Sequence, residues 1–490
     1  MSTSINVLKS SSLLLLIKLI QRGMGVISTI LLARLLVPAD FGIVAISVTL
    51  IYFIEAISSL GSEQYIIQKS DVDDTVLNTA WTVDIIFKSI FLIGFLLLIP
   101  YIAIFYENPR LELVLYVSST IILINALKNP GLFLLKRNFQ YKRIFWLSII
   151  QKFISFLVVI AIAIIDPSYW AMVVGDIVSA LILSFGSYKI HAFRPKISLD
   201  GFLEQWLFSK WIILRGIVGY SRSQFDTFIV SMIYSPAKLG GYHLVRQLSI
   251  MPSTEIIAPA VEPLLAAFSR SKSDKLKLAY QFRLSFLIVT IIAMPIAGYL
   301  WIFPEPIIDT LLGEKWVSTY QYLSSFSVFF LSIALIQIPA ALCVAIGKLK
   351  GLFVYEVLSM ILIMIVLWNI REVNLISFIL VRGGLGLITL TGLLIYLNVH
   401  VKINILYLLG IVSPVVLSVL ISIYLSDYFY TGVNLPLLAL AYSTVLFMSI
   451  YALILYLLFF VFLGKSEEWH QLNNLVSSQL VKIRKLLVKT

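Results

Sequence analysis

Long apolar runs separated by short polar turns extend along the whole chain of 490 residues. A run of about 20 apolar residues is long enough for one helix to cross a bilayer. The breaks carry residues typical of turns, as in Val37-Pro38-Ala39-Asp40 and Ser235-Pro236-Ala237. The pattern predicts about fourteen spanning helices, at residues 8–36, 41–60, 79–104, 112–135, 145–165, 170–190, 211–234, 241–268, 282–303, 317–346, 351–370, 375–398, 406–425 and 436–463.

Composition supports the same fold class. Hydrophobic residues make up 60% of the chain and charged residues only 13%, so a soluble protein of this length would lack the polar surface to cover its core. We therefore predict an all-α polytopic membrane protein. The single cysteine, Cys343, lies in an apolar run, which excludes a disulfide within the chain and a cysteine-rich metal site. The first apolar run is too long for a cleavable signal peptide and carries Lys18 and Arg22.

The net charge of +12 indicates topology rather than nucleic-acid binding, because most basic residues lie in short loops. With the N-terminus in the cytoplasm, cytoplasmic segments hold about 23 Lys and Arg, and external loops about four. We predict a multi-pass protein of the cytoplasmic (inner) membrane with both termini in the cytoplasm. The basic tail, 467–490, has Leu472, Leu475, Leu480, Ile483 and Leu487 at near-helical spacing. It is expected to lie on the anionic inner leaflet or to be disordered.

A short motif occurs twice. Pro38-Ala39-Asp40-Phe41-Gly42 and Pro236-Ala237-Lys238-Leu239-Gly240 share the pattern Pro-Ala-x-apolar-Gly, about six predicted helices apart. If this similarity is not chance, it indicates a parallel repeat, with two six-helix lobes around a central cavity. The predicted parts are an N-terminal lobe (1–195), a cytoplasmic linker (196–210), a C-terminal lobe (211–400), two extra helices (401–464) and the tail (465–490).

Basic residues inside predicted helices are the candidate substrate-binding groups. A cation in the membrane interior costs about 2.5–3.5 kcal/mol on insertion scales. Lys18 and Arg22 are four residues apart and share one helical face, and Arg215 and Arg222 are two turns apart. Together with Arg246 they predict a cationic cavity for phosphate or an acidic sugar, because arginine can grip phosphate with two parallel hydrogen bonds.

Three acidic residues in predicted helices, Glu55, Asp226 and Glu255, are candidates for ion coupling or charge pairing. Asp84 lies four residues before Lys88 and is the expected partner of that lysine. If every buried cation has its own acidic partner, the charges are structural instead.

The predicted helix 241–268 contains Pro252, Pro259 and Pro263. Each proline removes a helical hydrogen bond, so we expect this helix to be kinked.

Signatures of catalysis are absent from the sequence. The four histidines, His191, His243, His400 and His470, form no metal-ligand or acid–base motif, and there is no Walker A loop. The longest predicted external loop, 303–316, has the length of an ordinary connector. We therefore expect no enzyme activity, catalytic residue, metal or cofactor.

Several segments resemble Wzx-type polysaccharide flippases in their order and spacing, and most closely the colanic-acid-exporter-like branch. They are residues 31–42, 65–69, 134–141, 223–226, 239–242 and 312–316, and the resemblance covers about residues 10–350. These flippases are part of the multidrug/oligosaccharidyl-lipid/polysaccharide exporter superfamily.

The resemblance implies alternating-access transport of an undecaprenyl-diphosphate-linked oligosaccharide from the cytoplasmic to the outer leaflet, for exopolysaccharide, capsule or O-antigen. It implies membrane lipid, a polysaccharide polymerase and export machinery as partners, and no nucleic acid. The alternatives are a multidrug exporter of the same superfamily, a flippase for the peptidoglycan lipid precursor, and a membrane-embedded polysaccharide enzyme.

Overall fold

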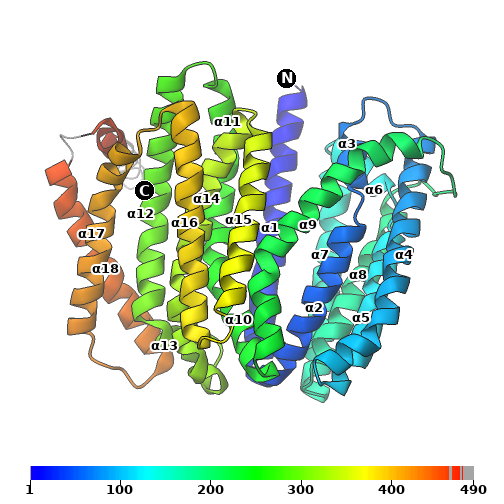
Figure 1. Ribbon diagram of the computed structural model, residues 1–490, viewed down its shortest axis with the longest axis horizontal. Coiled ribbons are helices and arrows are strands. Elements are labelled where there is room, and N and C mark those ends of the chain that lie inside the picture. Colours follow the sequence, from blue (N-terminus) through cyan, green and yellow to red (C-terminus); the bar gives the residue numbers. More distant parts are fainter. Residues whose placement is uncertain (1, 463–465, 475–476, 478–490) are drawn as a thin grey trace, which may run out of the picture. The chain divides into compact units, whose positions relative to one another are not determined.

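The computed structural model describes residues 2–462, 466–474 and 477, and within these residues the chain forms helices and loops without strands. Figure 1 shows their arrangement. The helices up to the middle of the chain are α1 (Ser2–Leu35), α2 (Pro38–Ser58), α3 (Ser62–Gln68), α4 (Asp74–Phe105), α5 (Pro109–Ala126), α6 (Gly131–Arg137), α7 (Tyr141–Ile165), α8 (Trp170–Ile190), α9 (Phe202–Ile233) and α10 (Pro236–Pro252). They are followed by η1 (Ser253–Ile257), α11 (Ala258–Arg270), α12 (Lys275–Ile302), α13 (Pro304–Leu311), η2 (Glu314–Thr319), α14 (Tyr320–Ala345), α15 (Leu349–Asn369), α16 (Leu375–Val401), α17 (Ile405–Phe429) and α18 (Pro436–Phe462).

The all-helical, multi-pass class is confirmed, but the count of fourteen spans is not. Among the described residues, 12 helices are long and apolar enough to cross a membrane. The predicted spans 211–234 and 241–268 are both helical, as α9 and as α10–η1–α11, yet neither is among the 12. The charged and polar residues that made these segments candidates for a substrate site also lower their hydropathy.

The predicted helix 112–135 ends early, at Ala126, and a separate short helix starts at Gly131. Pro130 between them has no amide hydrogen to donate to a continuing helix. The Asn129 side chain accepts a hydrogen bond from the Gly131 amide at 2.8 Å and so caps the new start. A side chain at Gly131 would collide with the His191 ring, so any other residue would require this ring to move.

The helices form two compact units, residues 1–244 with 360–371 and residues 245–359 with 372–490. In the first unit α1 packs on α7, α7 on α8, α5 on α4 and α8, and α2 on α5 and α9. In the second unit α14 packs between α12 and α16, α12 also contacts α17, and α17 contacts α18 (Figure 1).

The helix predicted at 241–268 is interrupted in the second unit. A π-helical turn, η1, follows Pro252 and divides the helix predicted at 241–268. Pro259 then lies in the first turn of α11, where a missing amide hydrogen costs little. Gln337 of α14 donates a hydrogen bond to Ser253 Oγ at 2.8 Å, which fixes the irregular turn against its neighbour.

The start of the basic tail packs against the second unit. Trp469 is 2% exposed and its Nε1 donates to the Ile411 carbonyl at 3.1 Å. Glu468 is fully buried and accepts a 2.7 Å hydrogen bond from Arg283 Nε. Leu472 packs on the same cluster, whereas Leu475, Leu480, Ile483 and Leu487 lie outside the described residues. This first part of the tail therefore completes a protein core.

Candidate substrate site

The two copies of the Pro-Ala motif meet in the first unit. Each begins a helix, α2 at Pro38 and α10 at Pro236. The Cα of Gly42 faces the carbonyl group of Pro236, and the Cα of Gly240 faces that of Pro38. A Cβ at either glycine would overlap the opposite carbonyl group. The contact is reciprocal, as two related copies of one motif would make, and we call these four residues the glycine clasp.

The predicted cations of the first unit lie on two of its helices. Lys18 and Arg22 are on α1, and Arg215 and Arg222 are on α9. Lys18 and Arg215 are exposed, whereas Arg22 and Arg222 are half-buried. The two helices pack on different neighbours, α1 on α7 and α9 on α2. All four basic residues take part in polar or electrostatic contacts.

Asp226, one helical turn beyond Arg222, is completely buried. Its Oδ2 accepts a hydrogen bond from the Tyr242 hydroxyl at 2.7 Å, and the tyrosine is also completely buried. This bond ties α9 to α10. Reasoning from the sequence missed Tyr242 as a partner, although it ends one of the segments that resemble Wzx-type proteins. This hydrogen bond satisfies one oxygen of the buried carboxylate.

Arg246 and Arg382 share one aromatic ring in the second unit. Their guanidinium carbons lie 5.2 Å and 4.6 Å from the centre of the Phe329 ring, within the range of a cation–π interaction. Both arginines are nearly buried, at 9% and 5% exposure. The two guanidinium carbons are thus within about 10 Å of each other. Gly383 allows α16 to approach the backbone at Phe329, where a Cβ would lie 2.8 Å from its amide nitrogen.

A polar cavity of about 400 Å³ lies inside the first unit. At its wall Glu55 forms a 3.2 Å ion pair with Lys88 and accepts a 2.9 Å hydrogen bond from Asn125. The sequence predicted Asp84 as the partner of Lys88, but Asp84 accepts its hydrogen bond from Ser62 Oγ at 2.8 Å. Helical spacing shows only which residues share one face of α4. The carboxylate that pairs with Lys88 comes from another helix, α2, across the cavity.

The structure also shows where Lys128 and Glu255 lie. Lys128 lines the same cavity, and burial, reinforced by the nearby positive charge of Lys88, lowers its pKa to about 8. Glu255 lies in the π-helical turn, half-buried, and accepts a hydrogen bond from Thr254 Oγ1 at 3.0 Å.

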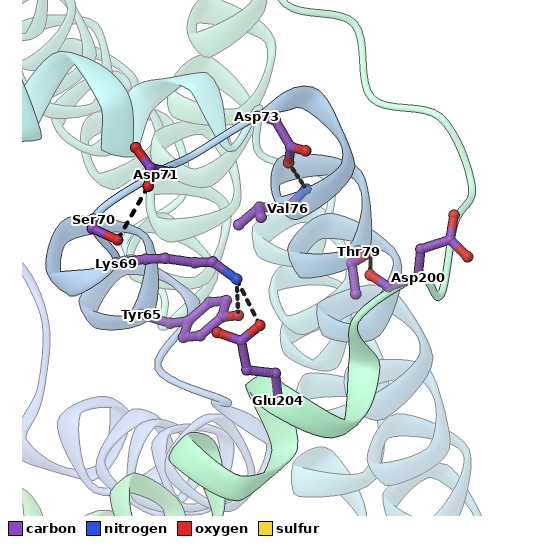
Figure 2. Close-up of polar contacts among 9 residues, drawn as sticks. All are labelled: Tyr65, Lys69, Ser70, Asp71, Asp73, Val76, Thr79, Asp200 and Glu204. Atoms are coloured by element: carbon purple, nitrogen blue, oxygen red, sulfur yellow. Dashed lines mark hydrogen bonds and ion pairs between the residues drawn. The ribbon is translucent and has the colours of Figure 1, made fainter.

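The predicted linker is attached to the first unit by several polar contacts (Figure 2). Lys69 Nζ contacts Glu204 Oε2 at 2.7 Å and the Tyr65 hydroxyl at 3.1 Å. Thr79 Oγ1 donates to the Asp200 carbonyl at 2.6 Å. The hydrogen bond to Glu204 raises the pKa of Lys69, and the same bond lowers the pKa of Glu204.

No group of three or more His, Cys, Asp or Glu side chains within the described ranges is arranged to hold a metal ion. Arginine, lysine and carboxylate side chains at the predicted positions can attract or repel a charged solute.

The comparisons with known proteins concern the family and the fold of the chain. The sequence profile of a family described as polysaccharide biosynthesis protein matches residues 31–321. The succinoglycan biosynthesis transport protein ExoT of Rhizobium meliloti is 21% identical over 61% of this chain and 61% of its own length. The lipopolysaccharide biosynthesis protein WzxC of Escherichia coli is 22% identical over 60% of this chain and 61% of its own length. The chain thus matches about three fifths of these relatives' length.

Among solved structures, the lipid II flippase MurJ in an inward closed conformation has a TM-score of 0.74 and 16% identity. The superposition covers 91% of this chain and 98% of that chain, so the two share a fold. The resemblance to Wzx-type proteins is confirmed by the match to WzxC. Because the family profile covers more than half of the sequence, the chain belongs to the polysaccharide biosynthesis protein family.

Proposed function

We propose that the protein is a flippase that moves a polyprenyl-diphosphate-linked oligosaccharide from the cytoplasmic to the outer leaflet for surface polysaccharide biosynthesis. The observation that carries the proposal is the family match over residues 31–321, together with relatives named for succinoglycan transport and lipopolysaccharide biosynthesis. The fold shared with a lipid II flippase is consistent with a cargo of this chemical class.

The cations on α1, α9 and α10 support a phosphate-bearing cargo. Lys18 and Arg22 on α1, and Arg215 and Arg222 on α9, would neutralise the diphosphate in the N-terminal part of the chain. In the second unit Arg246, oriented by Phe329, would contribute further positive charge. The cationic substrates of a multidrug exporter would be repelled by the same side chains.

The transport cycle we propose is alternating access between two lobes, residues 1–195 and 211–400, with the linker 196–210 on the cytoplasmic side. Both termini face the cytoplasm of a cell with this protein in its inner membrane. Residues 401–464 are an appendage to the lobes. The cargo is passed to a polymerase and export machinery, and the protein transports rather than catalyses.

The test is export of surface polysaccharide by cells that carry single alanine variants. Arg22→Ala and Arg222→Ala should each abolish export while the protein remains in the membrane, because each loses bidentate phosphate contact. Arg22→Lys should recover only part of the activity, because lysine retains the charge but not the fork geometry.

The matched control is Arg34→Ala, on the same helix as Arg22 but at its exposed end. It should export normally. Normal export by both Arg22→Ala and Arg222→Ala would remove these residues from the mechanism. Efflux of a cationic dye, without flipping of lipid-linked oligosaccharide in proteoliposomes, would overturn the proposed function.

A further inference from the structure

A second cavity, of about 680 Å³, lies in the second unit. It is formed where α12 ends and α14 begins, together with α13, the start of α16 and the loop that joins α17 to α18. Figure 1 shows α13 beside the start of α18. The volume is in the range of small-molecule sites, typically 300–1,000 Å³. In the topology predicted from loop charges, this end of the unit faces the outside of the cell.

The charged groups of this cavity are all acidic. Glu305, Asp309 and Asp427 line it, and no lysine, arginine or histidine does. In the part of the chain that the structure describes, none of these three carboxylates is engaged in a hydrogen bond or ion pair, so their oxygens are available as acceptors. A phosphate or a carboxylate ligand would meet like charge here. The cavity therefore selects a neutral or positively charged ligand, unlike the cationic site proposed for the diphosphate.

Aromatic rings supply the apolar surface of the cavity. Trp301 is 43% exposed, and Tyr430 also lines the wall. Tyr430 is held edge-on against Phe303, with ring centres 4.9 Å apart, and stacks on Tyr442 at 5.7 Å. Burial raises the pKa of Tyr430, and nearby Tyr299 and Glu305 raise it further. Rigid rings with polar tips bind ligands that have both apolar and polar faces.

Amide side chains complete the set of polar groups. Gln321 and Asn434 line the cavity and offer both donors and acceptors. Ser324 Oγ donates to the Trp301 carbonyl at 2.9 Å, which fixes the backbone beneath the indole. Carboxylate and amide oxygens accept hydrogen bonds from hydroxyl groups, and the charged acceptors make the stronger bonds. A sugar ring presents hydroxyls around its edge and C–H groups on its faces, which matches this lining.

We propose that this cavity, which we call the acidic–aromatic pocket, binds the carbohydrate portion of the cargo, as a neutral or amine-bearing oligosaccharide. The inference rests on the proposed function for the identity of the glycan. The carboxylates and amides receive the sugar hydroxyls, and Trp301 and Tyr430 cover the ring faces. The pocket has no group that would hold a diphosphate, so it retains the glycan and leaves the lipid anchor free in the outer leaflet.

The test uses the full-length protein in lipid nanodiscs and a lipid-free probe. The probe is the repeat-unit oligosaccharide released by mild acid from the surface polysaccharide of the source strain, titrated by calorimetry. Wild-type protein should bind it, and Trp301→Ala and Asp309→Ala should each weaken binding by about tenfold, the equivalent of 1.4 kcal/mol. Absence of binding to the wild-type protein would overturn the inference.

Tyr428→Ala is the matched control, because Tyr428 is 77% exposed, lies two residues from Tyr430 and does not line the pocket. It should bind like the wild type, and the pocket variants should keep the wild-type melting temperature. Binding of spermidine in place of the oligosaccharide would mark a cation site and also overturn the inference.

Each of the two proposals can be rejected without rejecting the other. The probe carries neither lipid nor phosphate, so its binding reports on the pocket alone. Flipping of the lipid-linked cargo in proteoliposomes reports on the proposed function. Oligosaccharide binding without flipping would reject the flippase and retain a glycan-binding pocket.

Discussion

The glycine clasp can be tested by adding one methyl group to each side. In Gly42→Ala the new carbon would lie 2.6 Å from the carbonyl carbon of Pro236, and closer still to its oxygen. In Gly240→Ala it would lie 2.9 Å from the carbonyl carbon of Pro38. Ordinary contact begins at 3.4 Å, so the helix starts must separate by about 0.8 Å or more.

The atoms in the way belong to backbone, which cannot rotate aside. Inserting a methyl group into such a contact typically costs about 1–3 kcal/mol. We expect each single variant to lower the melting temperature of the purified protein, measured by tryptophan fluorescence in detergent. The double variant should lose less than the sum, because the first methyl group already opens the contact that the second would fill.

Gly94→Ala is the control. It lies in α4 with no atom close to its missing Cβ, so alanine should be neutral or stabilising through helix propensity, by up to about 1 kcal/mol. Single variants that melt like the wild type, or a double variant with a fully additive loss, would show that the two motifs do not share one contact.

Two other predictions concern polar and aromatic contacts away from the clasp. Trp469→Ala should destabilise the protein by about 3–5 kcal/mol, the usual cost of removing a buried tryptophan, whereas exposed His470→Ala should not; equal melting temperatures would disprove the docking of the tail. Lys69→Ala should lower the melting temperature near neutral pH, because the ion pair with Glu204 raises the pKa of the lysine above its usual 10.5 and lowers that of the glutamate below 4.5. The stabilisation is then complete between these two values, and is lost as pH rises through the folded-state pKa of Lys69 or falls through that of Glu204. A difference between Lys69→Ala and wild type that is independent of pH would exclude the ion pair as its cause.

Hydrophobic periodicity located most helices to within a few residues, since membrane-crossing segments must be apolar over their whole length. The segment predicted at 170–190 is α8, Trp170–Ile190. The largest error at a helix start is α9, which begins at Phe202 rather than residue 211. Its first turn contains Glu204, so the apolar pattern begins later than the helix.

The partners of charged residues were harder to predict, because they come from other helices. Spacing along one helix suggested Asp84 for Lys88, whereas the ion pair is with Glu55. Nothing in the sequence links Arg246 and Arg382, which lie far apart in the chain and share the ring of Phe329. The repeated Pro-Ala motif indicated a repeat, but the pattern did not predict that its two copies meet directly.

The docked start of the tail has a consequence for biosynthesis. Arg283 and Leu287 enter the membrane with α12, long before the ribosome reaches Glu468 and Trp469. Until then the nascent protein lacks the carboxylate that pairs with Arg283 and the indole that covers the apolar cluster around Leu287. A polypeptide terminated before Glu468 would therefore leave the cluster around Leu287 uncovered, and accessible to proteases and chaperones, even when every helix before it is inserted.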